Sequence, residues 1–197
     1  LGAQVYVWLL HLANRFLLHG IAGYVPPGLV SEGGSPIEVV GGLGLWLVPL
    51  SVGLGGLLSG IIVTRFAPEA EGHGTDAAIT AYHQKGGAVR GRVPLVKAVS
   101  SAITIGSGGA AGREGPVAQI SAGFGSNFAA WLGCSPRERR LLMLAGVAAG
   151  LSAVFRSPLG TAVFAVEVLY SSMEFEARAL IYTIMAAVTG YAVNGLF

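Results

Sequence analysis

Residues Gly106–Ile120 read GSGGAAGREGPVAQI and place an arginine beside a glutamate within a run of glycine and alanine. The segments on both sides are apolar enough to lie in a lipid bilayer. Ionisable residues in such surroundings are costly, and they mark a functional site by default. An interpretation of this stretch must therefore account for its two charges as well as its glycines.

The composition predicts an all-α, multi-pass integral membrane protein. Of the 197 residues, 53% are hydrophobic and only 11% are charged, whereas charged residues make up about 25% of a typical soluble domain. The 31 glycines suit membrane helices whose backbones approach closely. The net charge of +2 forms no basic stripe, which argues against a nucleic-acid partner. The single cysteine, Cys134, excludes an intrachain disulfide and a four-cysteine metal site, and is interpreted as an apolar filler.

Several predicted helices are shorter than the roughly 20 residues that cross the hydrocarbon core, which indicates half-spanning elements. The clearest full span is Gly44–Phe66, where Gly56 and Gly60 have the small-xxx-small spacing of closely packed membrane helices. The other predicted helices are 5–19, about ten residues from Gly74, Val93–Ile105, Pro116–Trp131, Arg139–Phe155, Pro158–Tyr170 and Ala177–Leu196.

Two polar connections separate these helices. Residues 20–36, GIAGYVPPGLVSEGGSP, have turn chemistry and predict an extramembrane loop. The connection His83–Lys97 contains basic residues and no acid, so the positive-inside rule places it on the cytoplasmic side. Its basic residues are Lys85, Arg90, Arg92 and Lys97. Because the sequence begins at Leu1 inside an apolar run, without an initiator Met or a signal peptide, we expect the true N-terminus to be missing.

Two breaks between helices predict a binding site for a small anion. They are Ala70–Asp76 (AEGHGTD) and Ala110–Pro116 (AAGREGP), and each places glycine amides at the start of a helix. Such helix starts present unpaired N–H groups and the positive end of the helix dipole, which bind anions. If both starts point to the middle of the bilayer, they form an anion site without a full positive charge.

Glu114 is the candidate gate of this site. Its predicted position at a helix N-terminus lets its carboxylate occupy the place of a passing anion, and movement or protonation of the carboxylate then opens the path. Arg113 is interpreted as a brace for the loop or as a source of positive potential. The alternative is an ordinary Arg113–Glu114 ion pair that holds a loop.

The motif GREGP at 112–116, followed by VAQI, resembles the second selectivity-filter motif of the CLC family of chloride channels and chloride/proton exchangers. The resemblance continues in order through FAPEA at 66–70, VPLVKA at 93–98 and LAGVAAGLSAVFRSPLGTAVFAVEV at 144–168. It implies that residues 1–197 form the N-terminal half of a CLC-type transmembrane domain, the first of two inverted repeats, with no separate soluble domain. It also implies a homodimer with one pore per subunit, a second half that completes each pore, bound chloride or a similar anion, no other cofactor or metal, and no enzymatic activity.

The resemblance assigns an anion-binding filter in two parts. The first part is Gly72, His73, Gly74, Thr75 and Asp76, and the second is Gly112, Arg113, Glu114, Gly115 and Pro116. The family's usual first motif is GSGIP, so His73 replaces a serine whose hydroxyl helps to hold the anion, and the preferred anion is left open. An imidazole N–H can donate as a hydroxyl does; alternatively His73 is turned away and only the amides matter. Asp76 is expected to cap its helix or favour its start.

Further departures bear on coupling to protons. The family's exchangers carry a Glu-Glu pair, which here reads Glu167-Val168, so the sequence favours a channel over an exchanger. Glu167 is a secondary site candidate, with a buried structural acid as its alternative role. Arg156, between two apolar helices, is expected to reach the interface or to pair with an acid.

Other functional classes have weaker support. Gly106–Ala111 fits G-x-G-x-x-A for dinucleotide binding, but no β-rich segment precedes it and no acid follows about 20 residues later. A metal site from His73, Asp76 and His83 rests on three residues alone. The alternatives that remain within the family are a passive anion channel, a proton-coupled exchanger and a non-conducting homologue.

Overall fold

The computed structural model describes residues 2–25, 44–170 and 177–196, and within these ranges the regular structure is helical. The helices are α1 (Gly2–Ala13), α2 (Gly20–Ala22), α3 (Leu47–Phe66), α4 (Thr75–Gln84), α5 (Arg92–Gly106), α6 (Glu114–Trp131), α7 (Pro136–Phe155), α8 (Pro158–Tyr170) and α9 (Ala177–Asn194). The predicted all-α fold is therefore confirmed. Most of the predicted extramembrane loop at 20–36 lies outside the described residues.

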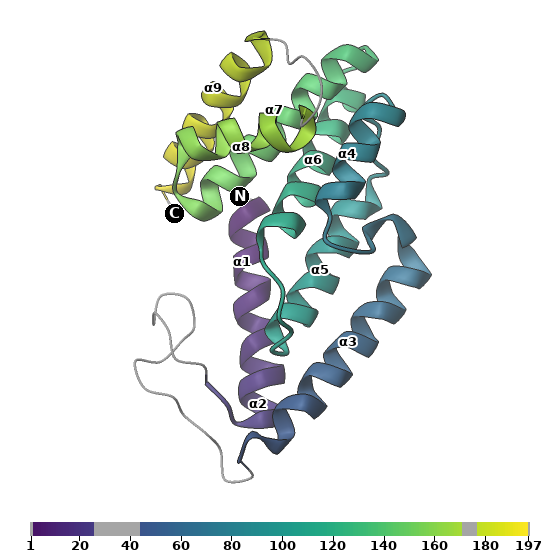
Figure 1. Cartoon of the computed structure of the whole chain (residues 1–197), viewed down its shortest axis with the longest axis vertical. Helices are drawn as coiled ribbons and strands as arrows, with labels where there is room; N and C mark the ends of the chain where they lie inside the picture. The colour runs from purple at the N-terminus through teal and green to yellow at the C-terminus, as the bar shows by residue number, and fades with distance from the viewer. Residues whose placement is uncertain (1, 26–43, 171–176, 197) are drawn as a thin grey trace.

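The helices form two groups, which are joined where α5 of the first packs against α6 of the second (Figure 1). At the lower end in this view, α1 and α3 converge, and a π-helical turn, η1 (Asn14–His19), connects α1 to α2. At the upper end, α7, α8 and α9 pack together. The short elements η3 (Gly44–Trp46) and η4 (Pro68–Ala70) are 3-10 turns at the two ends of α3.

α3 is the one helix of the described part that is long and apolar enough to cross a membrane by itself. Its 20 residues rise about 30 Å, which matches the hydrocarbon core. α4 has only 10 residues, α8 has 13 and α5 has 15. These short helices agree with the predicted half-spanning elements.

The core forms where α6 packs against α7, and glycine makes this close packing possible. A Cβ on Gly125 would lie 2.9 Å from the Leu142 carbonyl carbon, and a Cβ on Gly146 would lie 2.5 Å from the Ser121 carbonyl oxygen. α7 begins with a capping box, in which the Ser135 hydroxyl accepts from the Glu138 amide while the Glu138 carboxylate accepts from the Ser135 amide at 2.8 Å. With this cap, α7 begins at Pro136, which is three residues before the predicted start at Arg139.

Gly56 and Gly60, which have the small-xxx-small spacing, make no close contact within the described residues. Both lie on an open face of α3, with no atom within 4 Å of an added Cβ, so they do not pack against another helix of the described part. The close contact is made by Gly55, which faces the Ser107 side chain. The Ser51 hydroxyl, one turn earlier, donates to the Ser107 carbonyl oxygen at 3.2 Å. The interface of α3 with the end of α5 is therefore formed by Ser51 and Gly55.

Candidate functional site

The two predicted breaks meet in the structure. The first leaves α3 through η4 and reaches α4, which has Gly74 as its N-cap residue. The second leaves α5 and reaches α6, which begins at Glu114. A Cβ on Gly74 would lie 2.7 Å from the Gly115 carbonyl oxygen, and a Cβ on Gly115 would overlap the His73 carbonyl oxygen and ring. The starts of α4 and α6 are thus in direct contact, as the anion-site hypothesis requires.

Glycine is required in the first break because of its backbone conformation. Gly72 has φ 75° and Gly74 has φ 113°, a region that residues with a side chain rarely adopt. Gly74 also has no room for a Cβ, as described above. Conformation and packing therefore both select glycine at the start of α4.

Both helix starts offer backbone amides. The first intrahelical bond of α4 is from the Ala78 amide to the Gly74 carbonyl oxygen at 3.1 Å, and that of α6 is from the Val117 amide to the Arg113 carbonyl oxygen at 3.0 Å. In each helix, the backbone N–H groups that come before this bond have no carbonyl acceptor within the helix. Pro116 has no N–H, so α6 itself offers the amides of Glu114 and Gly115. Two positive dipole ends converge on one region.

Glu114 lies at this point as the first residue of α6, and its side chain is exposed. Its carboxylate folds back over the Cα of Gly112, so that a Cβ added to Gly112 would overlap the Oε2 oxygen and lie 3.1 Å from Cδ. Only glycine at 112 leaves space for this position of the carboxylate. Arg113 precedes the helix in a helical conformation (φ −84°, ψ −15°) and is half-buried.

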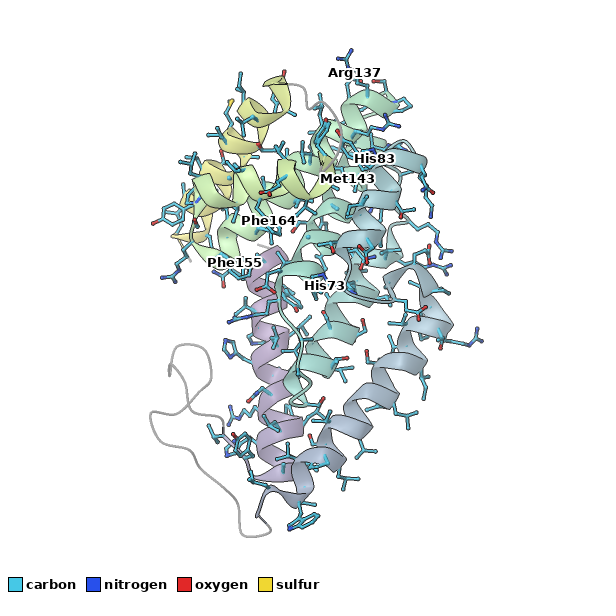
Figure 2. All side chains as sticks on the ribbon, viewed as in Figure 1. His73, His83, Arg137, Met143, Phe155 and Phe164 are labelled. Carbon is cyan, nitrogen blue, oxygen red and sulfur yellow. The ribbon has the colours of Figure 1, made fainter. Side chains whose placement is uncertain are left out.

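His73 also lies at the contact between the breaks, in the middle of the molecule (Figure 2). Its Nδ1 is 3.1 Å from the Thr75 hydroxyl oxygen, and its ring packs on the Cα of Gly115. Asp76 is exposed in the first turn of α4, where a negative charge is favourable. The expected alternative of a side-chain cap is wrong, because the N-cap position belongs to Gly74 and carries no side-chain hydrogen bond.

A cavity of about 350 Å³ opens beside the two breaks, between α3 and α5. The breaks line it with Gly72, His73, Ala111, Gly112 and Pro116, and α5 lines it with Lys97, Ser100, Ser101 and Thr104. The open face of α3, including Gly56 and Gly60, forms another wall, and Glu71 adds one carboxylate to the lining. Gly56 and Gly60 therefore face this cavity.

Lys97 is the residue of this site that the sequence reasoning misplaced. It lies within α5 rather than in the polar connection, and its side chain is only 4% exposed. Its Nζ donates to the Ala70 carbonyl oxygen at 2.9 Å and to the Gly72 carbonyl oxygen at 2.6 Å. An ammonium group thus holds the first break in place and adds positive charge to the cavity wall. The sequence signal that could have indicated a buried Lys97 was its position in an apolar helical segment, one turn before Ser100 and Ser101.

Glu167 does not belong to this site. It is exposed on α8 and does not line the cavity, so its alternative role as a buried acid is wrong. Arg156 ends α7 with φ 53° and is also exposed. Its side chain is therefore not buried between α7 and α8.

The two alternatives from other functional classes, already weak in the sequence, gain no support from the described residues. Gly106–Ala111 begins at the last residue of the helix α5 rather than after a strand, as a dinucleotide-binding turn would. His83 lies at the far end of α4 from His73, with its Nε2 2.5 Å from the Leu169 carbonyl oxygen. Within the described ranges no three histidine, cysteine or acidic residues are close enough to hold a metal ion.

Comparison with known proteins agrees with this fold. A sequence profile described as "Voltage gated chloride channel" matches residues 55–197. In the solved structures, a eukaryotic CLC transporter matches 99% of this chain and 36% of its own chain, with a TM-score of 0.70 and 22% identity. The protein therefore belongs to the CLC family and has part of a CLC fold, and it is an integral membrane protein.

Curated relatives cover most of this chain, but this chain spans well under half of each of them. An uncharacterised protein of Methanocaldococcus jannaschii is 34% identical over 149 residues, which is 75% of this chain and 35% of the relative. The voltage-gated ClC-type chloride channel ClcB of Yersinia pestis is 31% identical over 171 residues, or 85% of this chain and 39% of the relative. The H(+)/Cl(-) exchange transporter ClcA of Yersinia pestis bv. Antiqua (strain Angola) is 32% identical over 137 residues, which is 69% of this chain and 29% of the relative.

Proposed function

We propose that the full-length protein transports chloride or a similar small anion across a membrane, through a site at the contact between α4 and α6. The observation that carries this proposal is the meeting of the two helix starts at Gly74 and Gly115. Their amides and dipoles attract an anion without binding it irreversibly. The relatives support the choice of ion, because one is named a chloride channel and another an H(+)/Cl(-) exchange transporter.

Glu114 is the proposed gate of this transport. Its support is that Glu114 is the first residue of α6 and that its carboxylate folds over Gly112, directly before that helix start. A carboxylate and a chloride ion compete for the same positive helix end. When the carboxylate leaves or is protonated, the site becomes available to the anion.

We propose channel-like transport as the first choice and proton-coupled exchange as the second. Val168 stands where exchangers of the family have their second glutamate, which favours the channel. Exchange has its own support in the similarity to a relative named as an exchanger. A non-conducting homologue is the third alternative, and an absence of flux from the full-length protein would favour it.

The complete pore is proposed to need the rest of the protein and to form in a homodimer. The cavity beside the two breaks is open on the face of α3, so the described residues do not enclose a path for an ion. α8 and α9 expose the apolar side chains Leu159, Val163, Ile181, Met185 and Val188, which fit contact with a second subunit or with lipid. No catalytic role is proposed for any of these groups.

Uptake of labelled chloride into liposomes that contain the full-length protein tests the transport proposal. Uptake well above that of protein-free liposomes is expected, with nitrate and fluoride measured in parallel because His73 replaces the filter serine. A reconstituted, correctly folded protein that takes up none of the three anions would contradict the proposal.

A further inference from the structure

A second cavity of about 460 Å³ lies between α4, α6 and the turn that precedes α5. Small apolar side chains form most of its lining: Ala77, Ala78, Ala81, Ala88, Val89, Val93 and Ala122. Three charged residues, Glu69, Lys85 and Arg90, complete it. None of these residues lines the cavity beside the two breaks.

The apolar and charged parts of this cavity lie in a fixed order along α4. Ala77, Ala78 and Ala81 follow one another from the start of the helix, and Lys85 comes directly after its last residue. The 10 residues of α4 rise about 15 Å, roughly half of the hydrocarbon core. Because α4 begins at the buried contact with α6, its alanines lie nearer that contact and Lys85 lies at the other end of the helix.

The other two charged residues of the cavity, Glu69 and Arg90, pair with each other close to the end of the span α3. Glu69 comes three residues after Phe66, the last residue of α3, and its carboxylate accepts two hydrogen bonds from the Arg90 guanidinium. Lys85, by contrast, forms no salt bridge with an acidic residue of the described ranges. The cavity lining therefore has a net positive charge.

Gln119 connects α6 to the segment that carries Glu69. Its side chain is 3% exposed, it lines the same cavity, and its Nε2 donates to the Glu69 carbonyl oxygen at 2.8 Å. This bond holds η4, and with it the Glu69–Arg90 pair, against α6. The charged residues are thus fixed in position relative to the apolar lining.

We propose that this cavity binds an anionic phospholipid of the bilayer, with its phosphate at Lys85 and Arg90 and part of an acyl chain along the alanines of α4. Basic pockets between membrane helices bind acidic headgroups, and the volume is within the range of ligand pockets. A free anion would leave the alanine lining unfilled, and a neutral lipid would leave the positive charge uncompensated. The proposal does not depend on anion transport by the other site.

Native mass spectrometry of the full-length protein in detergent tests the proposal. The probes are phosphatidylglycerol and phosphatidylcholine with identical acyl chains. The structure predicts that phosphatidylglycerol binds several-fold better. Lys85→Gln is expected to weaken its binding about fivefold, the effect of one basic residue near an anionic headgroup. Ala88→Leu, which adds bulk at an exposed position of the lining, is expected to weaken it several-fold with every charge kept.

Arg137→Gln is the matched control, because Arg137 is an exposed basic residue at the start of α7 that does not line the cavity. Its binding of phosphatidylglycerol is expected to equal that of the wild type. Equal binding of the two lipids, or equal losses in Arg137→Gln and Lys85→Gln, would overturn the proposal. A further pair of results would also overturn it: millimolar inorganic phosphate displaces phosphatidylglycerol, and Ala88→Leu binds phosphatidylglycerol as well as the wild type does. The site would then be one for free phosphate. Elution volume and melting temperature show that each variant is folded.

Discussion

Gly74 and Gly115 are in van der Waals contact, and neither has room for a side chain. The first is the N-cap residue of α4 and the second is in the first turn of α6. Two residues 41 positions apart thus bring two helix starts together, and the proposed anion site exists only while this contact is kept. Its geometry yields predictions that stability and binding measurements can check.

Gly74→Ala is expected to destabilise the protein by roughly 1–3 kcal/mol, because the new Cβ would overlap Gly115 and would require a disfavoured φ. The melting temperature of the full-length protein in detergent is the measurement. Gly53→Ala is the control, since Gly53 is within α3 and an added Cβ there meets no atom within 4 Å. Equal melting temperatures for the two variants would contradict the packing described for Gly74.

Lys97→Met is expected to cost about 1.5–3 kcal/mol, because it leaves the Ala70 and Gly72 carbonyl oxygens without their charged donor. It also removes positive charge from the cavity wall, so chloride should stabilise the variant less than the wild type. Melting temperatures at increasing chloride concentration measure both effects, since a ligand raises the stability of the state that binds it. A chloride-induced shift equal to that of the wild type would show that Lys97 does not act on the anion.

His73→Ser is expected to change the relative uptake of chloride and nitrate while the fold is kept, because it replaces an imidazole at the contact between the breaks with the hydroxyl that the family usually has there. Thr75→Val is the companion variant, which removes the hydroxyl 3.1 Å from His73 Nδ1 but keeps the ring. If His73→Ser leaves the order of the anions unchanged, the ring takes no part in selectivity and only the amides do.

The Glu69–Arg90 pair is expected to contribute a small, acid-sensitive stabilisation. The hydrogen bonds from Arg90 lower the pKa of the Glu69 carboxyl group below its ordinary value. A lowered folded-state pKa means that the contribution is complete above the unfolded-state pKa of about 4.3 and is lost as the pH falls through the folded-state value. Because the pair is partly exposed, its size is about 0–1 kcal/mol. The free energies of unfolding of the wild type and of Glu69→Gln, measured between pH 3 and pH 7, should differ most at pH 7. A difference that stays constant over this range would contradict this account.

The sequence was sufficient to predict the helices and the two breaks, because these depend on local signals. Apolar runs end at glycine and proline, and α8 has the predicted bounds Pro158–Tyr170. GREGP placed Glu114 at a helix start, which is confirmed. The role of Glu114 as a gate and the filter assignments stay predictions.

Sequence alone did not predict side-chain positions that depend on how a helix is rotated about its axis, or contacts between residues far apart in the chain. Lys97 bonds a carbonyl oxygen 27 positions away, and no local pattern predicts such a partner. That Gly55 is the glycine of α3 that meets Ser107 at the end of α5 was not predictable either, because the helix is apolar on every side. Glu167 is exposed rather than buried for the same reason, since α8 is also apolar nearly all round.

Chloride efflux from liposomes containing the full-length protein, recorded together with external pH for wild type and Glu114→Ala, tests the central claim most directly. Glu167→Gln is the control, an acidic residue that is exposed on α8 and does not line the cavity beside the breaks. The account predicts chloride flux that changes in Glu114→Ala and not in Glu167→Gln. Flux without coupled protons supports the channel, and uphill proton movement that the Glu114 substitution abolishes supports the exchanger. Chloride flux that is identical in wild type and Glu114→Ala would contradict the assignment of Glu114 as the gate.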